Sequence, residues 1–234
     1  MVLDQSGCAN ETKDRLVLST AKTVICLHGM WMRRGVMLLV KRRLQNEHQY
    51  RAHLFGYPSM RRSLDENAQT LATYIAEQGF DSVHLVGHSL GGVVAMRALA
   101  LNPELPVHRV VCLGSPLCGS TPARRLNRKN WGKRLVGQTV LDGVVNTPAS
   151  EWAGEVCNTH EIGVIAGTVP LGLGQIASSF DGANDGTVAV SETRLRGVKD
   201  HICMAVNHTG LALSRDVTDQ IAAFFRRGKF LRDD

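Results

Sequence analysis

The stretch of sequence that decides the fold is Val83-His84-Leu85-Val86-Gly87-His88-Ser89-Leu90-Gly91-Gly92. Its first four residues are a largely apolar run that predicts a buried β-strand, and a helical pattern follows from Leu90. Between them stands G-x-S-x-G, whose glycines permit a strand-to-helix turn that strains the serine backbone. Such a turn raises the hydroxyl above the end of the sheet. Ser89 is therefore predicted to be a nucleophile and not a serine on an ordinary surface turn.

Strands and helices are predicted to alternate along the rest of the chain. Apolar runs typical of strands in a parallel sheet occupy residues 23–27, 50–57, 83–86, 107–113, 162–166 and 202–206. Apolar residues at helical spacing predict helices over residues 35–47, 63–78, 90–102 and 211–226. Ser63 and Glu66 form a capping box that opens the second helix, and Gly79 is placed to end it. The pattern predicts an α/β fold, with a mostly parallel central sheet flanked by helices.

Length and composition predict one domain over residues 1–234. A chain of 234 residues with 44% hydrophobic side chains can bury one substantial core. Residues 1–20 read as a polar leader that could add an edge strand through Leu16-Val17-Leu18. Residues 118–161 interrupt the alternation and are predicted to be an insertion over the sheet. No run of about 18 apolar residues occurs, which excludes a membrane-spanning helix.

The net charge and the cysteines indicate which classes of binding partner and which cellular compartment to expect. The net charge of +6 favours anionic partners such as phospholipid headgroups, acyl-CoA phosphates or nucleic acid. No nucleic-acid partner is expected, because the sequence has neither stacked-aromatic patterning nor a zinc-finger or RNP-like motif. The six cysteines include no C-x-x-C pair, and the N-terminus lacks the apolar segment of a secretory signal. A reduced, cytoplasmic setting is the expectation.

A serine hydroxyl attacks a carbonyl only if a neighbouring base takes its proton. In this type of fold the acid and the histidine follow the serine in the chain, each on a loop after a strand. Four histidines qualify by position: His108, His160, His201 and His208. His108 begins an expected strand, and His160 ends the insertion. His201 precedes the last expected strand, whereas His208 follows it and is the predicted base.

The predicted acid is Asp185, in the turn sequence Asn184-Asp185-Gly186-Thr187-Val188. It follows the strand expected at residues 162–166, and the chemistry of this turn suits a carboxylate that orients a histidine. Asp181 is the alternative acid. Either residue could also be a plain loop aspartate.

His28-Gly29-Met30-Trp31 ends the first strong strand. Gly29 lets the backbone turn there, so that an amide can face a bound carbonyl oxygen. The predicted oxyanion hole combines the amides of Met30 and Leu90, the second at a helix N-terminus that favours negative charge. Trp31 is expected to line the acyl pocket, and His28 to be a structural hydrogen bonder.

Five motifs occur in an order and spacing that can be compared with known families. They are His28-Gly29-Met30, Gly87-His88-Ser89-Leu90-Gly91-Gly92, Gly114-Ser115-Pro116-Leu117-Cys118-Gly119-Ser120, Asn184-Asp185-Gly186-Thr187-Val188 and Asn207-His208. Together they resemble the bacterial lipase and esterase branch of the α/β hydrolases, over roughly residues 23–226. The resemblance implies hydrolysis of carboxylic esters, with Ser89, Asp185 and His208 as the triad.

Two departures limit what the resemblance implies. Leu117, which is expected to contact the substrate, stands where the secreted true lipases usually have a histidine. Gly210 stands two residues after the predicted base, where those lipases normally have an acidic calcium ligand. We therefore expect no structural calcium. We also expect no other metal and no cofactor, because ester hydrolysis through an acyl-enzyme requires none. An intracellular esterase or lipase-like enzyme fits better than a secreted triacylglycerol lipase.

The insertion contains a basic amphipathic stretch. Its cations are Arg124, Arg125, Arg128, Lys129, Lys133 and Arg134, and they are interleaved with the apolar residues Leu126, Trp131, Leu135 and Val136. This pattern predicts a cationic lid over the site that contacts an anionic membrane surface or a phosphate-bearing substrate. The alternative is a solvated cap without such a role.

Three functions are compatible with these observations. The first is ester hydrolysis through an acyl-enzyme on Ser89, acting on a small-molecule ester or a lipid. The second is thioester hydrolysis on acyl-CoA, with Arg33 and Arg34 contacting the CoA phosphates. The third is a catalytically silent hydrolase fold that binds a lipid or a partner protein, against which the complete triad argues. Acyl chain length and oligomeric state do not follow from the sequence.

Overall fold

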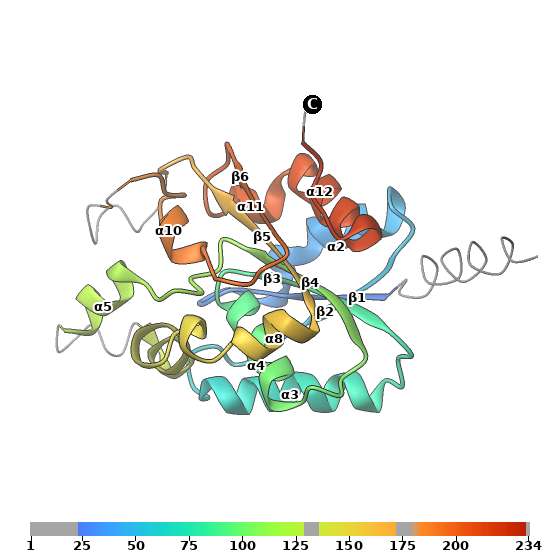
Figure 1. Cartoon of the computed structure of the whole chain (residues 1–234), viewed down its shortest axis with the longest axis horizontal. Coiled ribbons are helices and arrows are strands. Elements are labelled where there is room, and N and C mark those ends of the chain that lie inside the picture. The colour runs from blue at the N-terminus through green and yellow to red at the C-terminus, as the bar shows by residue number, and fades with distance from the viewer. Residues whose placement is uncertain (1–22, 129–135, 172–179, 181, 233–234) are drawn as a thin grey trace, which may run out of the picture.

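The computed structural model describes residues 23–128, 136–171, 180 and 182–232, which form three layers with a sheet in the middle (Figure 1). Within these residues, six parallel strands form one sheet in the order β2-β1-β3-β4-β5-β6. The strands are β1 (Thr23–Leu27), β2 (Arg51–Phe55), β3 (Val83–His88), β4 (Val107–Leu113), β5 (Glu161–Gly167) and β6 (Asp200–Met204). The six strands predicted between residues 23 and 206 are present, with small differences at the ends.

Helices cover both faces of the sheet (Figure 1). On one face lie α3 (Leu64–Glu77), α4 (Leu90–Leu101) and α8 (Gly154–Thr159). On the other face lie η1 (Arg34–Met37), α2 (Leu38–Asn46), α11 (Gly210–Leu213) and α12 (Arg215–Arg227). Neighbouring strand residues point to opposite faces, so that Leu85 belongs to the first hydrophobic cluster and Val86 to the second. Because all the strands are parallel, their carboxyl ends share one edge of the sheet.

Two predicted helices are divided in the structure. The segment predicted as one helix over residues 35–47 begins as the 3-10 helix η1 and continues as α2. The segment predicted as one helix over residues 211–226 is split into α11 and α12 at Ser214. Ser214 has an extended backbone, and its hydroxyl accepts the Val217 N–H as an N-cap. Apolar periodicity runs through both pieces and does not reveal this break.

Where the structure describes the insertion, it is a series of short elements. They are α5 (Thr121–Asn127), α7 (Gln138–Val140), η2 (Leu141–Asn146), η3 (Ala149–Glu151) and α8. Arg124, Arg125 and Arg128 are exposed on or next to α5, whereas Lys129, Lys133 and Arg134 lie outside the described residues, as do Trp131 and Leu135.

The second half of the insertion is part of the hydrophobic core. Val136, Val144 and Ala149 are at most 1% exposed and pack in the cluster beneath the sheet. The Gln138 N–H donates to the carbonyl of Met60 at 3.1 Å, which ties this half to the loop before α3. Ala123 and Leu126 of α5 pack against the same cluster while partly exposed.

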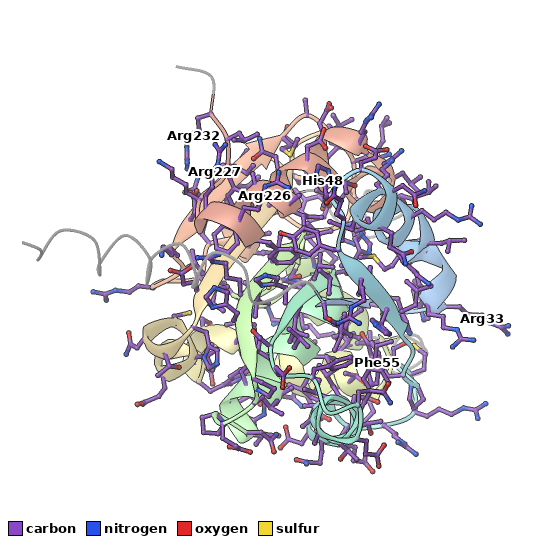
Figure 2. All side chains as sticks on the ribbon, turned by 90° about the vertical axis from the view of Figure 1, so that its right-hand side faces the viewer. Arg33, His48, Phe55, Arg226, Arg227 and Arg232 are labelled. Carbon is purple, nitrogen blue, oxygen red and sulfur yellow. The ribbon has the colours of Figure 1, made fainter. Side chains whose placement is uncertain are left out.

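Basic side chains occur on separate parts of the surface. Arg226 lies 3.4 Å from Nδ1 of His48, whereas Arg33 projects into solvent at another edge of the molecule (Figure 2). Among the helices of the described residues, none has both the length and the apolar composition that crossing a membrane requires. The leader and its predicted edge strand at residues 16–18 lie outside the described residues.

Candidate active site

Ser89 occupies a strained turn between β3 and α4. Its φ of 54° and ψ of −123° are unusual for a residue with a side chain. The turn is possible because neighbouring glycines leave room: a Cβ at Gly87 would lie 2.3 Å from the Gly92 nitrogen, and one at Gly91 would lie 2.7 Å from the His28 oxygen. The Ser89 N–H donates to the carbonyl of Leu113 at 2.7 Å, which fixes the turn to the next strand. Strain of this kind is typical of functional positions.

His208 and Asp185 form a buried pair. The Nδ1–H of His208 donates to Oδ2 of Asp185 at 2.7 Å. The two side chains are 9% and 1% exposed, so the hydrogen bond is shielded from water. The His208 N–H also donates to the carbonyl of Asp185 at 2.8 Å. With Nδ1 protonated and bonded, Nε2 of the neutral ring is left as a proton acceptor.

The carboxylate of Asp185 is held by its own turn. Its second oxygen, Oδ1, accepts the N–H groups of Thr187 at 2.9 Å and Val188 at 2.7 Å. A neighbouring Asn184 side chain accepts the Gly186 N–H at 3.0 Å, which stabilises the same turn. One oxygen of the carboxylate is thus fixed by the backbone, and the other is directed at His208.

Gly114 provides the space in which the pair meets. Its φ is +53°, and a Cβ there would lie 2.9 Å from Oδ2 of Asp185 and 3.2 Å from Nδ1 of His208. It would also lie 2.6 Å from Cδ1 of Leu211. The motif that contains Gly114 does not by itself indicate this role, although a glycine at the end of a buried strand is a recognisable signal of close backbone approach.

The loop after β1 is fixed by His28. Its Nδ1–H donates to the carbonyl of Gly29 at 2.8 Å, and its Nε2 accepts the Tyr57 N–H at 3.4 Å. The Tyr57 hydroxyl donates to the His28 carbonyl at 2.7 Å, and the two rings stack 4.5 Å apart. Burial lowers the pKa of the His28 imidazole and raises the pKa of the Tyr57 phenol, so both groups stay neutral. These contacts place Met30 beside the nucleophile turn.

A pocket of about 370 Å³ contains the candidate site. Ser89, His208, Met30 and Leu90 all line it, together with Gly29 and Trp31. Its remaining walls are mostly apolar and come largely from the insertion: Pro122, Ala123, Leu126, Val136, Val140 and Val144. Ser89, His208 and the two residues of the predicted oxyanion hole therefore line one cavity. A mostly apolar cavity with a few polar groups is typical of a small-molecule site.

Of the two residues predicted to contact the substrate, Trp31 lines the pocket and Leu117 does not. Trp31 lines the pocket mouth, is 54% exposed and has a φ of 58°. Leu117 is fully buried in the hydrophobic core and is not a lining residue, whereas its neighbour Pro116 lines the pocket. Leu117 therefore packs in the core and does not contact a ligand in the pocket, contrary to the prediction.

The other candidates for acid and base lie elsewhere. His108 is the second residue of β4, and His160 follows α8. His201 lies within β6, which begins two residues earlier than predicted, and it bonds to Thr193 at 2.9 Å. None of these three lines the pocket. Asp181 lies outside the described residues.

Groups that could bind a metal ion occur together at one place within the described ranges. Glu47, His48 and Asp219 have ligand atoms within 4.8 Å of one another. His48 already bonds to Asp219 at 2.8 Å, and Arg215 pairs with Glu47 at 3.0 Å. None of the three acidic or imidazole groups lines the pocket with Ser89.

Comparisons with known proteins agree with this architecture. The profile described as "Alpha/beta hydrolase family" matches residues 24–200. The mature lipase BlEst2 from Bacillus licheniformis has a TM-score of 0.67 at 19% identity, covering 88% of this chain and 91% of that chain. The esterase EaEST from Exiguobacterium antarcticum has a TM-score of 0.62 at 13% identity, covering 88% and 92%.

A third neighbour is the phospholipase PlaB from Legionella pneumophila, with a TM-score of 0.62 at 13% identity, covering 88% of this chain and 56% of that one. No curated protein sequence matches the chain. At these identities, the structural likeness shows the fold alone. The predicted fold, a parallel sheet flanked by helices, is confirmed.

Proposed function

The chain belongs to the alpha/beta hydrolase family, and from this premise we propose that it cleaves carboxylic esters through an acyl-enzyme on Ser89. The observation that carries the proposal is the buried hydrogen bond between Asp185 and His208, whose side chain lines the same pocket as Ser89. A carboxylate bonded to Nδ1 leaves Nε2 of the ring as the base, which is the arrangement that activates a serine hydroxyl.

The proposed reaction has two steps. In the first, His208 takes the Ser89 proton while Oγ attacks the ester carbonyl, and the N–H groups of Met30 and Leu90 stabilise the oxyanion. His208 then gives the proton to the leaving alcohol, and the acyl group stays on Ser89. In the second step His208 takes a proton from water while the water oxygen attacks the acyl carbon. His208 then gives this proton to Oγ of Ser89 as the acyl–Oγ bond breaks, which releases the free acid and restores the enzyme. Asp185 holds the ring throughout.

The pocket supports an apolar acyl group. Its wall around Ala123, Leu126 and Val140 consists of uncharged side chains, so it would bind a hydrocarbon chain by removing it from water. Thr209 and Thr187 add polar atoms close to His208. We propose that the acyl chain lies against the insertion and that the alcohol leaves past Trp31.

The mouth of the pocket supports contact with an anionic lipid surface or a phosphate-bearing leaving group. Trp31 and Leu171 line the mouth and are 54% and 64% exposed. Arg33 and Arg34 follow two and three residues after Trp31 and are exposed, and Arg33 projects into solvent (Figure 2). Aromatic and apolar groups beside cations are typical of surfaces that bind anionic membranes. The same arginines make acyl-CoA hydrolysis the second candidate.

A fluorophosphonate probe tests the proposal directly. We expect the parent protein to be labelled on Ser89 and to hydrolyse p-nitrophenyl esters. Ser89→Ala should abolish labelling and lower kcat by about 10⁵-fold or more, whereas Ser150→Ala, a change at an exposed serine of η3, should alter neither. Relative rates on p-nitrophenyl esters and acyl-CoA separate the first two functions. A folded parent that resists the probe would favour the non-catalytic binding protein.

A further inference from the structure

His88 lies between the nucleophile and the base, and the reaction described above does not use it. It is the last residue of β3, immediately before Ser89, and it is completely buried. Its Nε2–H donates to the backbone carbonyl of His208 at 2.8 Å. The two imidazole rings lie 4.7 Å apart at an angle of 49°. The side chain of His88 therefore spans from the strand that carries the nucleophile to the loop that carries the base.

The hydrogen bond from His88 completes the fixation of the His208 backbone. The His208 N–H is held by the carbonyl of Asp185 at 2.8 Å, and the His208 carbonyl is held by His88. Because the ring itself is bonded to Asp185 through Nδ1, His208 is held at three points by two residues. Of these, only the bond to His88 connects the loop to the strand before Ser89.

The other edge of the His88 ring faces the predicted oxyanion loop. A Cβ at Gly29 would lie 3.3 Å from Nδ1 of His88 and 3.0 Å from Cβ of Ser89. Among the described residues, Nδ1 of His88 has no hydrogen-bond partner. This assigns the proton to Nε2, where it is needed as a donor.

His88 is suited to this position because it stays uncharged. Burial, and to a smaller extent the neighbouring imidazole of His208, lower its pKa to about 3. A neutral donor next to the base adds no repulsion when His208 takes the serine proton. A lysine or arginine donor would carry a positive charge at the same place and would oppose that step.

We propose that His88 is a positioning residue that holds the His208 loop against the nucleophile turn. The inference rests on the proposed function, because it assumes that His208 serves Ser89. A shift of about 1 Å between reacting groups can cost about 10²-fold in rate. Loss of the His88 hydrogen bond should therefore act on the chemical step and not on substrate binding.

A matched pair of substitutions tests the proposal. His88→Gln keeps an uncharged N–H donor at about the length of Nε2, and His88→Met has a similar length without a donor. The concentration of active sites is first titrated with the fluorophosphonate probe, and kcat on p-nitrophenyl butyrate is calculated from it. We expect His88→Met to lower this kcat by about 10- to 100-fold, with KM changed by less than about threefold. His88→Gln should stay within about fivefold of the parent. Both variants should be compared at equal folded fraction.

A second measurement reports on position without turnover. We expect the low-field Nδ1 proton of His208 to be observed by NMR in the parent and in His88→Gln, and to be broadened by exchange in His88→Met. If the methionine variant does not fold, His88→Asn takes its place, because its amide is one methylene too short to reach the carbonyl. A methionine variant with the parent's kcat and the parent's low-field proton would overturn the proposal.

The same measurements separate this proposal from the proposed function. A parent protein that turns over no ester and takes up no probe would contradict ester hydrolysis, but the NMR comparison would still decide whether His88 positions His208. Conversely, a Ser89-dependent esterase whose glutamine and methionine variants lose rate and thermal stability to the same extent would retain the proposed function. That outcome would show that His88 contributes only to packing, and it would overturn its assignment as a positioning residue.

Discussion

The Nδ1 atom of His208 lies 2.7 Å from Oδ2 of Asp185, although 23 positions separate the two residues in the chain. The contact exists because β5 and β6 are neighbouring parallel strands whose carboxyl ends share one edge. Asp185 lies on the segment after β5, and His208 lies on the segment after β6. The fold therefore creates the pair from two loops that are distant in sequence.

Asp185→Asn should remove most of the activity without unfolding the protein. The amide oxygen can still accept the Thr187 and Val188 N–H groups, but an amide NH₂ facing His208 favours the wrong tautomer of the ring. We expect kcat to fall by about 10⁴-fold, measured on p-nitrophenyl butyrate with the thermal midpoint recorded in parallel. Asp181→Asn is the control and should stay within about twofold. Equal losses in the two variants would contradict the assignment of the acid.

Gly114→Ala should separate the acid from the base. Its methyl group would be forced to within 2.9 Å of Oδ2 of Asp185 at a φ of +53°, so the pair must move apart. We expect kcat to fall by about 10- to 100-fold. Gly79→Ala is the matched control, because Gly79 has a φ of +60° with nothing within 4 Å of its Cβ position.

The two glycine variants share the backbone strain and differ only in the contacts of the methyl group. Each should lose about 1–2 kcal/mol of unfolding free energy from the left-handed backbone, as measured by urea denaturation. Only Gly114→Ala should also lose activity per folded molecule. A normal kcat in Gly114→Ala would show that the pair tolerates displacement.

The order of the motifs allowed much of the fold and the triad candidates to be predicted. Apolar runs located the strands because buried parallel strands are apolar on both faces. Ser89 could be predicted because a glycine-flanked turn between a strand and a helix is a local feature, and the nucleophile turn has that form in the structure. His208 and Asp185 followed from the position of each residue after a strand. Whether all three groups act together stays a prediction that the proposed experiments test.

What could not be predicted depends on side-chain direction and on contacts distant in sequence. Leu117 sits in a motif, but nothing in the sequence says that it points into the core while Pro116 lines the pocket. The break at Ser214 is hidden because the apolar spacing is continuous across it. The role proposed for His88 depends on a carbonyl 120 positions away, which no local pattern encodes.

The pocket wall on the insertion should set the preferred acyl length. Ala123 lies on α5, is half-buried and lines the pocket. Ala123→Phe should fill part of the cavity and lower kcat/KM for p-nitrophenyl octanoate by about 10-fold or more, because even one or two methylenes that no longer fit cost about 1–3 kcal/mol. The value for the acetate should change by less than about twofold. Ala123→Ser, which keeps the volume, is the control, and parallel losses on both esters would contradict this placement of the acyl chain.

The folded protein should lose stability as the pH falls below about 6.5, and His88 should account for a measurable share. The pKa of His88 is lowered from 6.5 to about 3, chiefly by burial, so between these values the unfolded chain binds a proton that the folded chain does not. The unfolding free energy therefore rises with pH in this window and is lost as the pH drops through it. From pH 7.5 to pH 5.0, this one group should contribute a loss of about 2 kcal/mol. The pKa values of His28 and His108 are also lowered, chiefly by burial, which adds to the loss of stability in the same direction.

Urea unfolding at pH 7.5 and pH 5.0 measures the total loss of unfolding free energy. His88→Gln, whose side chain does not titrate, should show a loss smaller by about 2 kcal/mol, and an unchanged loss would mean that His88 is not held neutral in the folded protein.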